Sequence, residues 1–126
     1  MPIKIILLIE PDEDTANIIK KSLASDDIKV FMARSSQEAV DMADAKKPDL
    51  VILELAIPDQ NGVAFLHEFR SYADWSKIPV IVHTHLAISA QTTDKAWKLL
   101  GVAECLYKPT TSLKKLKTSV LSVLDV

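Results

Sequence analysis

The sequence contains a single cysteine, two glycines and six prolines, and neither sign of charge dominates. One cysteine permits no disulfide within the chain, which is typical of proteins that stay in the reducing cytosol. The formal net charge of −2 gives no overall field that would attract a nucleic acid backbone. The apolar run at residues 5–9 ends at Glu10 and is too short to span a membrane. We therefore expect a cytoplasmic domain that binds neither nucleic acid nor membrane.

The length of the chain and its small number of loop-forming residues limit how many domains and loops it can form. The 126 residues, 48% of them hydrophobic, can bury roughly two-thirds of the unfolded surface, so a complete core needs no disulfide or metal. Glycine and proline together take about half of their usual share. Since no linker, repeat or low-complexity segment interrupts the pattern, the sequence predicts a single domain over residues 1–126.

Two periodicities alternate along the chain. Short apolar runs of strand length are followed by segments whose apolar residues recur at helical spacing. The predicted strands cover residues 3–9, 30–33, 50–55, 80–84 and 104–107. The predicted helices cover residues 14–23 and 94–100, and three more begin after Ser35, after Gly62 and at Ser112. Ser35, with Glu38 three residues later, has the pattern of a capping box at a helix start.

This alternation favours an α/β domain whose five-stranded parallel sheet is covered by helices on both faces. In such sheets the functional site lies beyond the carboxyl ends of the strands. The candidate functional residues are therefore those at the predicted strand ends, residues 10–12, 54–56, 84–85 and 108–109.

Four local motifs occupy these strand ends. Glu10 closes the first strand, and Glu54 lies at the end of the third. Thr84 closes the fourth strand, and Lys108 with Pro109 follows the fifth. The motifs are residues 6–10, 48–58 with Gly62, 78–84 and 106–109. In this order and spacing they resemble the receiver domain of two-component response regulators over essentially the whole chain. The resemblance implies a flavodoxin-like (βα)5 three-layer sandwich with strand order 2-1-3-4-5, and a signalling module that is not an enzyme.

The resemblance also implies a role for each of these positions. In the family, an aspartate at the position of Glu54 attacks a phosphoryl donor and becomes an acyl phosphate. Two acids at the end of the first strand, of which Glu10 is one, help to hold Mg²⁺. A threonine or serine at the position of Thr84 and a lysine at the position of Lys108 contact the phosphoryl oxygens.

The acidic residues depart from this pattern. Glu54 is one methylene longer than aspartate, so its carboxylate lies further toward Thr84 and Lys108, a displacement that can cost much of the transfer rate. Pro11 replaces the second acid of the first strand and has neither a side-chain oxygen nor a backbone N–H. Asp12 follows one residue late and is the remaining candidate for the acidic pocket.

Two further substitutions alter the same pocket. His85 stands where the family has a very small residue, so we expect its imidazole to crowd the pocket. Cys105 replaces the aromatic residue that reports phosphorylation in the family. His83, His85 and Cys105 give only a weak pattern for zinc, and a lone cysteine in an apolar strand is more typical of a small buried hydrophobe. No metal site is predicted.

Glu54 has two interpretations, which are compatible. It is a buried acid neutralised by Lys108, because a buried charge needs such a partner. Alternatively, by reaching toward Lys108 and Thr84 it imitates the phosphorylated aspartate and holds the domain near one signalling state.

The aromatic residues give candidates for an interface. In the family, the surface formed by the fourth helix, fifth strand and fifth helix docks partners or a second copy, which makes Trp97 and Tyr107 interface candidates. An inward Trp97 that covers the fifth strand is the equally weighted alternative. Trp75 lies in a polar stretch and is expected to be partly exposed, whereas Leu113 is expected to be buried by the last helix.

The sequence thus predicts a pseudo-receiver that lacks the phosphoacceptor aspartate and acts through protein contacts without a cofactor. The expected partners are a histidine kinase, an output domain or another signalling protein. One alternative is a working receiver, phosphorylated at Glu54 or Asp12 with weakly bound Mg²⁺. Another is a small enzyme or cofactor binder on the same frame. Acidic residues 12–14 and the lack of a glycine-rich loop after the first strand disfavour a flavin or nucleotide.

Overall fold

A computed structural model of the protein describes residues 2–87 and 93–126. Five parallel strands form one sheet in the order β2-β1-β3-β4-β5. The strands are β1 (Lys4–Ile9), β2 (Ile28–Ala33), β3 (Leu50–Leu53), β4 (Val80–Thr84) and β5 (Val102–Tyr107). The helices are α1 (Glu13–Leu23), α2 (Ser36–Lys46), α3 (Gly62–Ser71), α4 (Asp94–Leu99) and α5 (Leu113–Leu124), with short 3₁₀ turns η1 (Ala73–Trp75) and η3 (Lys108–Thr110). The predicted fold class and strand order are confirmed.

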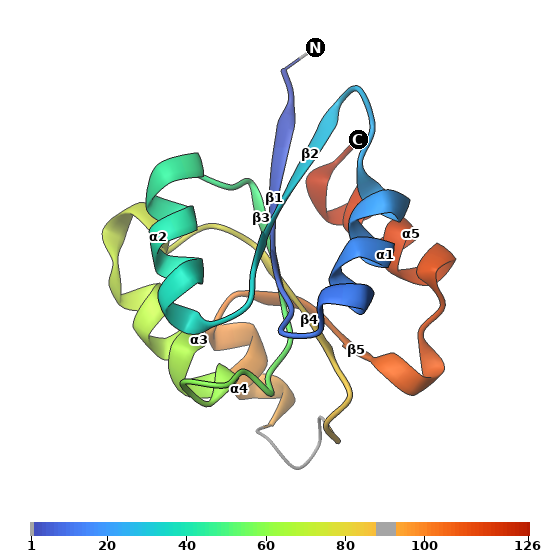
Figure 1. The fold of residues 1–126 in the computed structure, drawn as a ribbon. Coiled ribbons are helices and arrows are strands. Elements are labelled where there is room, and N and C mark those ends of the chain that lie inside the picture. The colour runs from blue at the N-terminus through green and yellow to red at the C-terminus, as the bar shows by residue number, and fades with distance from the viewer. Residues whose placement is uncertain (1, 88–92) are drawn as a thin grey trace.

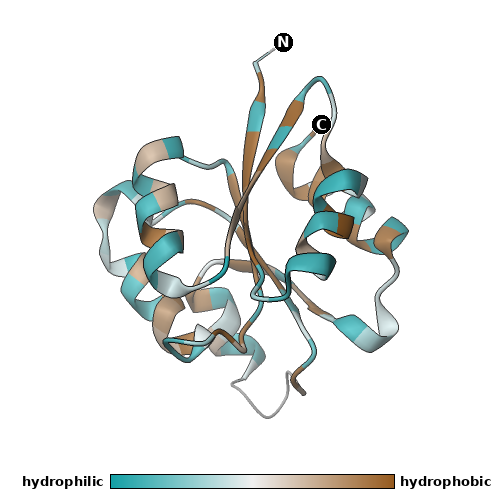
Figure 2. Cartoon of the chain, viewed as in Figure 1, coloured by the Kyte–Doolittle hydropathy of each residue, from teal (hydrophilic) through white to brown (hydrophobic). Residues whose placement is uncertain are grey.

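The sheet separates two hydrophobic clusters. Helices α1 and α5 cover one face, and α2, α3 and α4 cover the other (Figure 1). Successive side chains of a strand point to opposite faces, so Ile6 and Leu8 join the cluster under α1 and α5, whereas Leu7 and Ile9 join the cluster under α2 and α3. The strands are apolar along most of their length, whereas the helices combine hydrophilic and hydrophobic segments (Figure 2). This burial of both faces explains why the strand sequences are continuous apolar runs.

Side-chain caps fix where the helices begin. Ser35 Oγ accepts a hydrogen bond from the Glu38 backbone N–H at 3.2 Å, as the capping-box pattern predicts. Asp12, Asn61, Thr93 and Ser112 cap the other four helices in the same way. Within the part of the chain that the structure describes, no helix has the length and hydropathy needed to cross a bilayer.

Three sequence expectations about element ends and burial are wrong. The third strand ends at Leu53, because the carbonyl of Leu55 accepts from Gly62 N in a turn instead of continuing the ladder. Trp75 is only 7% exposed, because its ring stacks on that of Phe69 with centroids 5.0 Å apart. Leu113 is 43% exposed because it is the first residue of α5 and lies outside its buried face.

Gly62 brings α3 close to the segment that follows β3. A Cβ atom at this position would lie 2.5 Å from Leu55 Cα, closer than real Cβ contacts allow. Only glycine therefore permits α3 to begin against the backbone next to Glu54. This close approach places the loop after β3 at the carboxyl edge of the sheet.

Arg70 joins three segments near the opposite end of α3. Its guanidinium donates from Nε to Leu100 O at 2.6 Å, from Nη1 to Trp75 O at 2.8 Å and from Nη2 to Gly101 O at 3.1 Å. Gly101 has a φ of 71°, and a Cβ there would lie 2.6 Å from Arg70 Nη2. Arg70 thus ties the turn before β5 and the η1 segment to α3.

We expect Arg70→Met to lower the free energy of unfolding by about 2–4 kcal/mol, because carbonyl oxygens at three positions lose their donor. Urea denaturation measures the change. Arg34→Met is a matched control, since Arg34 is exposed, and we expect it to change stability by less than about 0.5 kcal/mol. Equal losses for the two variants would contradict the role of Arg70 as a clamp.

Candidate functional site

Four strand ends meet at the carboxyl edge of the sheet. Glu10 follows β1, Glu54 follows β3, Thr84 ends β4 and Lys108 follows β5. Parallel strands bring these positions to one edge, and Glu10, Glu54 and Thr84 are all buried. The structure therefore brings together the acidic and switch positions that the resemblance singles out, apart from the carboxylate of Asp12.

Lys108 joins the two buried carboxylates. Its Nζ lies 2.7 Å from Glu54 Oε1 and also donates to Glu10 Oε1. Burial alone would lower the pKa of Lys108, but hydrogen bonds from its ammonium to Glu10 and Glu54 outweigh burial and raise it. The lysine therefore stays charged, and the two acids share its single positive charge.

Glu54 accepts hydrogen bonds from residues that follow or end three different strands. Thr84 Oγ1 donates to Oε2, and the Ala56 backbone N–H donates to the same oxygen at 3.1 Å. On Oε1, His85 contributes its backbone N–H at 3.2 Å and its Nδ1 at 2.8 Å. Burial would raise the pKa of Glu54, but these donors and the Lys108 ammonium lower it to about 2. Glu54 is therefore an ionised carboxylate at neutral pH.

Glu54 also fixes the start of the segment after β4. The Thr84 hydroxyl donates to Glu54 and accepts from the Leu86 backbone N–H at 3.1 Å. His85 adds two bonds of its own to the same carboxylate. Three consecutive residues therefore depend on the position of one side chain.

The acidic pocket expected at Glu10 and Asp12 is not assembled. The Asp12 carboxylate caps α1 by accepting from Thr15 N at 3.0 Å and from the Thr15 hydroxyl, and these bonds lower the pKa of Asp12. Only the backbone of Asp12 reaches Glu10, donating from its N–H to Oε2 at 3.1 Å. Pro11 supplies no side-chain oxygen. With the Lys108 ammonium between Glu10 and Glu54, these residues do not fit a Mg²⁺ site of the family kind.

His83, His85 and Cys105 do not form a common site. His83 faces a hollow of about 200 Å³ between α1 and the start of α5, whereas His85 turns to Glu54. Cys105 packs against the cluster under α2, α3 and α4, and burial raises its pKa to about 11, so the thiol stays protonated. Among residues 2–87 and 93–126, no three metal-ligating side chains of these types converge.

His83 makes the stability of the fold depend on pH. Burial, with the nearby Lys108 charge, lowers its pKa from 6.5 to about 4. The unfolded chain therefore binds a proton below pH 6.5 that the folded chain refuses until about pH 4, and stability falls as the pH drops through this window. We expect His83→Leu to reduce the loss of stability between pH 7 and pH 5, measured by urea denaturation. His67→Leu, at an exposed position, is the control, and an unchanged pH slope in His83→Leu would refute the assignment.

The two aromatic interface candidates have different surroundings. Tyr107 is 39% exposed at the carboxyl end of β5, and Leu99, the last residue of α4 before the start of β5, is also exposed. Trp97 is 3% exposed and belongs to the core under α4, so the inward alternative is the correct one. Its indole Nε1 has no hydrogen-bond partner among the described residues.

Several contacts of the site were not predicted from the sequence, among them the bonds from His85 to Glu54. The bond from Lys108 to Glu10 spans from β5 to β1, which are not neighbours in the sheet. The Ala56 N–H on Glu54 depends on the turn after β3, which sequence patterns do not specify. Asp59 in that turn also caps α2, accepting from Ser36 N at 2.8 Å. The turn-rich composition of residues 58–62 was the available signal for this connection.

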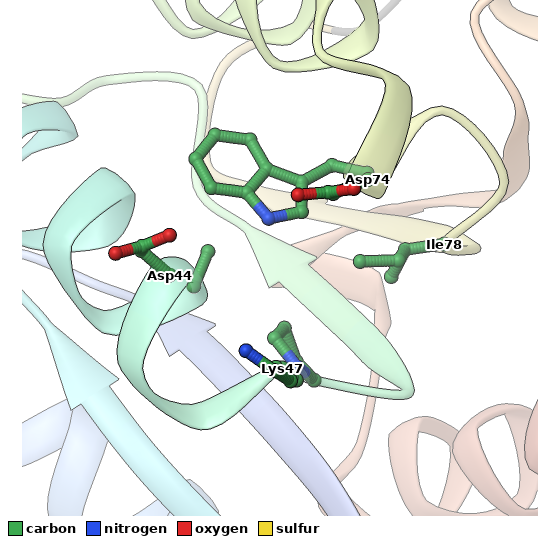
Figure 3. A pocket seen from close by; sticks show the side chains of 7 residues that line it. Asp44, Lys47, Asp74 and Ile78 are labelled. Carbon is green, nitrogen blue, oxygen red and sulfur yellow. The ribbon is translucent and has the colours of Figure 1, made fainter.

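A second hollow lies at the other end of the sheet. Its volume is about 330 Å³, and Pro48 before β3 and Ile78 before β4 place it at the amino ends of the strands. Asp44, Lys47 and Asp74 surround it (Figure 3). It is therefore remote from Glu54 and forms no part of the candidate site.

The comparisons with known proteins agree with this geometry. The sequence profile of the response regulator receiver domain matches residues 6–121, so the chain belongs to this family. It is 33% identical over 105 residues to the KDP operon transcriptional regulatory protein KdpE of Escherichia coli, covering 82% of this chain and 44% of KdpE. It is 34% identical over 91 residues to protein PilH of Pseudomonas aeruginosa, covering 71% of this chain and 73% of PilH.

Solved structures share the fold over nearly the full chain. The non-phosphorylated HemR receiver domain of Leptospira biflexa superposes with a TM-score of 0.84 at 28% identity, covering 98% of this chain and 95% of that one. A sensor protein from Polaromonas sp. JS666 superposes with a TM-score of 0.86 at 22% identity, covering 98% of both chains. The chain is thus a response regulator receiver domain, a module of two-component signalling. It spans less than half the length of KdpE.

Proposed function

We propose that this receiver domain does not accept a phosphoryl group at Glu54 and acts through protein contacts in a conformation that Glu54 itself maintains. One observation carries the proposal: the Glu54 carboxylate already contacts Thr84 and Lys108. These are the positions that contact the phosphoryl oxygens in the family. A carboxylate in the same place supplies an anion to the same two donors without any transfer step.

The chemistry of the pocket supports this proposal. Phosphoryl transfer to Glu54 requires a free carboxylate oxygen, but Oε1 receives three donors and Oε2 receives two. Attack of the Glu54 carboxylate on a phosphoryl donor would remove the charge that pairs with Lys108 and break several of these hydrogen bonds. Low basicity, expressed in the pKa of about 2, also weakens Glu54 as a nucleophile.

The exposed imidazole of His85 also blocks access to the Glu54 carboxylate. Its side chain is 58% exposed while Glu54 is 2% exposed, so the ring lies between the carboxylate and solvent. A phosphoryl donor would have to displace this ring to reach Oε1. His85 thus takes the space that a very small residue leaves open in the family.

The proposed output is a protein surface. The segment after β4 is tied to Glu54 through Thr84 and His85, and it leads into α4. Partners of this surface are a histidine kinase, an output domain or another signalling protein, and a second copy of the chain is the alternative. Exposed Tyr107 and Leu99 are the residues we expect such a partner to cover.

Intact-mass measurement with Mg²⁺ and acetyl phosphate tests the proposal. We expect no alkali-labile increment of one phosphoryl group, since acyl phosphates hydrolyse in alkali. An alkali-labile increment that is absent from Glu54→Gln would overturn the proposal and establish Glu54 as an acceptor. An increment that instead disappears in Asp12→Asn would support the alternative in which Asp12 is phosphorylated.

A further inference from the structure

His85 pairs with Glu54 through Nδ1, and its other ring nitrogen, Nε2, makes no hydrogen bond to the residues that the structure describes. Nδ1 lies 2.8 Å from Glu54 Oε1, an oxygen that also accepts from the Lys108 ammonium. Because that oxygen belongs to an ionised carboxylate, Nδ1 is the donor and carries the ring hydrogen. In the neutral ring, Nε2 then holds a lone pair, and the side chain that carries it is 58% exposed.

This arrangement activates an imidazole nitrogen as a nucleophile. A carboxylate on one ring nitrogen fixes the tautomer and the ring orientation and stabilises the positive charge that develops when the other nitrogen reacts. Glu54 is rigidly held for this role by Thr84 and Ala56. The stabilisation grows as the ring becomes cationic, so it lowers the barrier of the reaction and not only the energy of the resting state.

We propose that His85 Nε2 accepts a phosphoryl group from phosphoramidate donors, compounds with a P–N bond. The donor reacts in the form that is protonated on nitrogen. The Nε2 lone pair forms a new N–P bond while the P–N bond of the donor breaks, and the donor nitrogen leaves as a neutral amine. The ring retains its Nδ1 hydrogen, and the resulting imidazolium charge is balanced by Glu54. No oxidant, metal or further proton is needed. The phosphoryl group then lies on a residue other than the acceptor position, and Glu54 keeps its bonds.

The chain offers internal comparisons for this chemistry. His67 on α3 is exposed, and its side chain makes no hydrogen bond within the described residues. His83 is 7% exposed in the core. The three histidines therefore represent an activated, an unassisted and a shielded imidazole in one molecule.

The experiment incubates the full chain with potassium phosphoramidate and follows phosphorylation by intact mass and peptide mapping. We expect an alkali-stable, acid-labile phosphoryl group on His85 that forms about tenfold faster than on His67, the effect of one charge-assisted hydrogen bond on a barrier. His85→Gln should abolish the fast phase, and His67→Gln should leave it unchanged. In Glu54→Gln, which has lost the carboxylate charge, the rate at His85 should fall to that of His67.

Three results would overturn the inference. They are equal rates at His85 and His67, a fast phase that survives His85→Gln, and a rate at His85 that is unaffected by Glu54→Gln. Circular dichroism of each variant establishes that the fold is retained. An alkali-labile group on Glu54 would overturn the proposed function instead, so the two failures are distinguishable.

Discussion

Replacing Lys108 by methionine lowers the free energy of unfolding by about 3–5 kcal/mol at pH 7, the cost of leaving buried charges without their partner. Lys108 is the cation bonded to both Glu10 and Glu54, which are 3% and 2% exposed. Methionine keeps most of the side-chain volume, so the loss reports charge and hydrogen bonding more than packing. Urea denaturation measures it.

Two controls make the Lys108 result specific. Lys115→Met alters an exposed lysine on α5 and should change stability by less than about 0.5 kcal/mol. The triple variant Glu10→Gln/Glu54→Gln/Lys108→Met removes the charges together, and we expect it to recover a large part of the lost stability. A Lys108→Met loss no greater than that of Lys115→Met would show that the buried pair does not stabilise the fold.

The second large effect is a gain of phosphorylation. Pro11→Asp restores an acid beside Glu10, Glu54→Asp withdraws the carboxylate by one methylene, and His85→Ala removes the ring that covers it. With Mg²⁺ and acetyl phosphate, we expect the triple variant to acquire one alkali-labile phosphoryl group at least about 100-fold faster than the unaltered chain, since a displacement of about 1 Å alone can cost that factor. Intact mass against time measures both rates.

Variants with one or two of these changes identify which residue prevents phosphorylation. Pro11→Asp alone should stay unphosphorylated, because Glu54 still occupies Thr84 and Lys108. The Pro11→Asp/Glu54→Asp pair should react, and His85→Ala should raise its rate. If the triple variant remains inert although it folds, the loss of acceptor chemistry has another cause than these three residues.

The sequence predicted the site because parallel topology fixes where strand ends lie. The acids and the lysine each follow an apolar strand and Thr84 ends one, so all four lie at one edge of the sheet. The expected ion pair between Glu54 and Lys108 is present. The boundaries of β4 were also predictable, since Pro79 precedes it and its five residues are all buried. By contrast, β2 and β5 each begin two residues before the apolar pattern indicates, because pairing with a neighbouring strand extends the ladder.

Other features depend on contacts that no local pattern encodes. Trp75 lies in a polar stretch, yet it is buried because Phe69 stacks on it and Arg70 binds its carbonyl. Asp12 had the right residue type for an acidic pocket, but its carboxylate caps α1 by accepting a hydrogen bond from Thr15 N. The position of the His85 ring was predictable only as crowding, because its bond to Glu54 depends on how the chain turns after β4.

Glu54 holds the pocket in one conformation without an acyl phosphate. Amide NMR spectra recorded with and without Mg²⁺ and trifluoroberyllate, an analogue of the acyl phosphate group, test whether the pocket still responds to such a group. We expect unchanged resonances at Thr84, His85 and Lys108 in the unaltered chain, and shifts at the same positions in the Pro11→Asp/Glu54→Asp/His85→Ala variant. Shifts of these resonances in the unaltered chain, saturating with trifluoroberyllate, would contradict this role of Glu54.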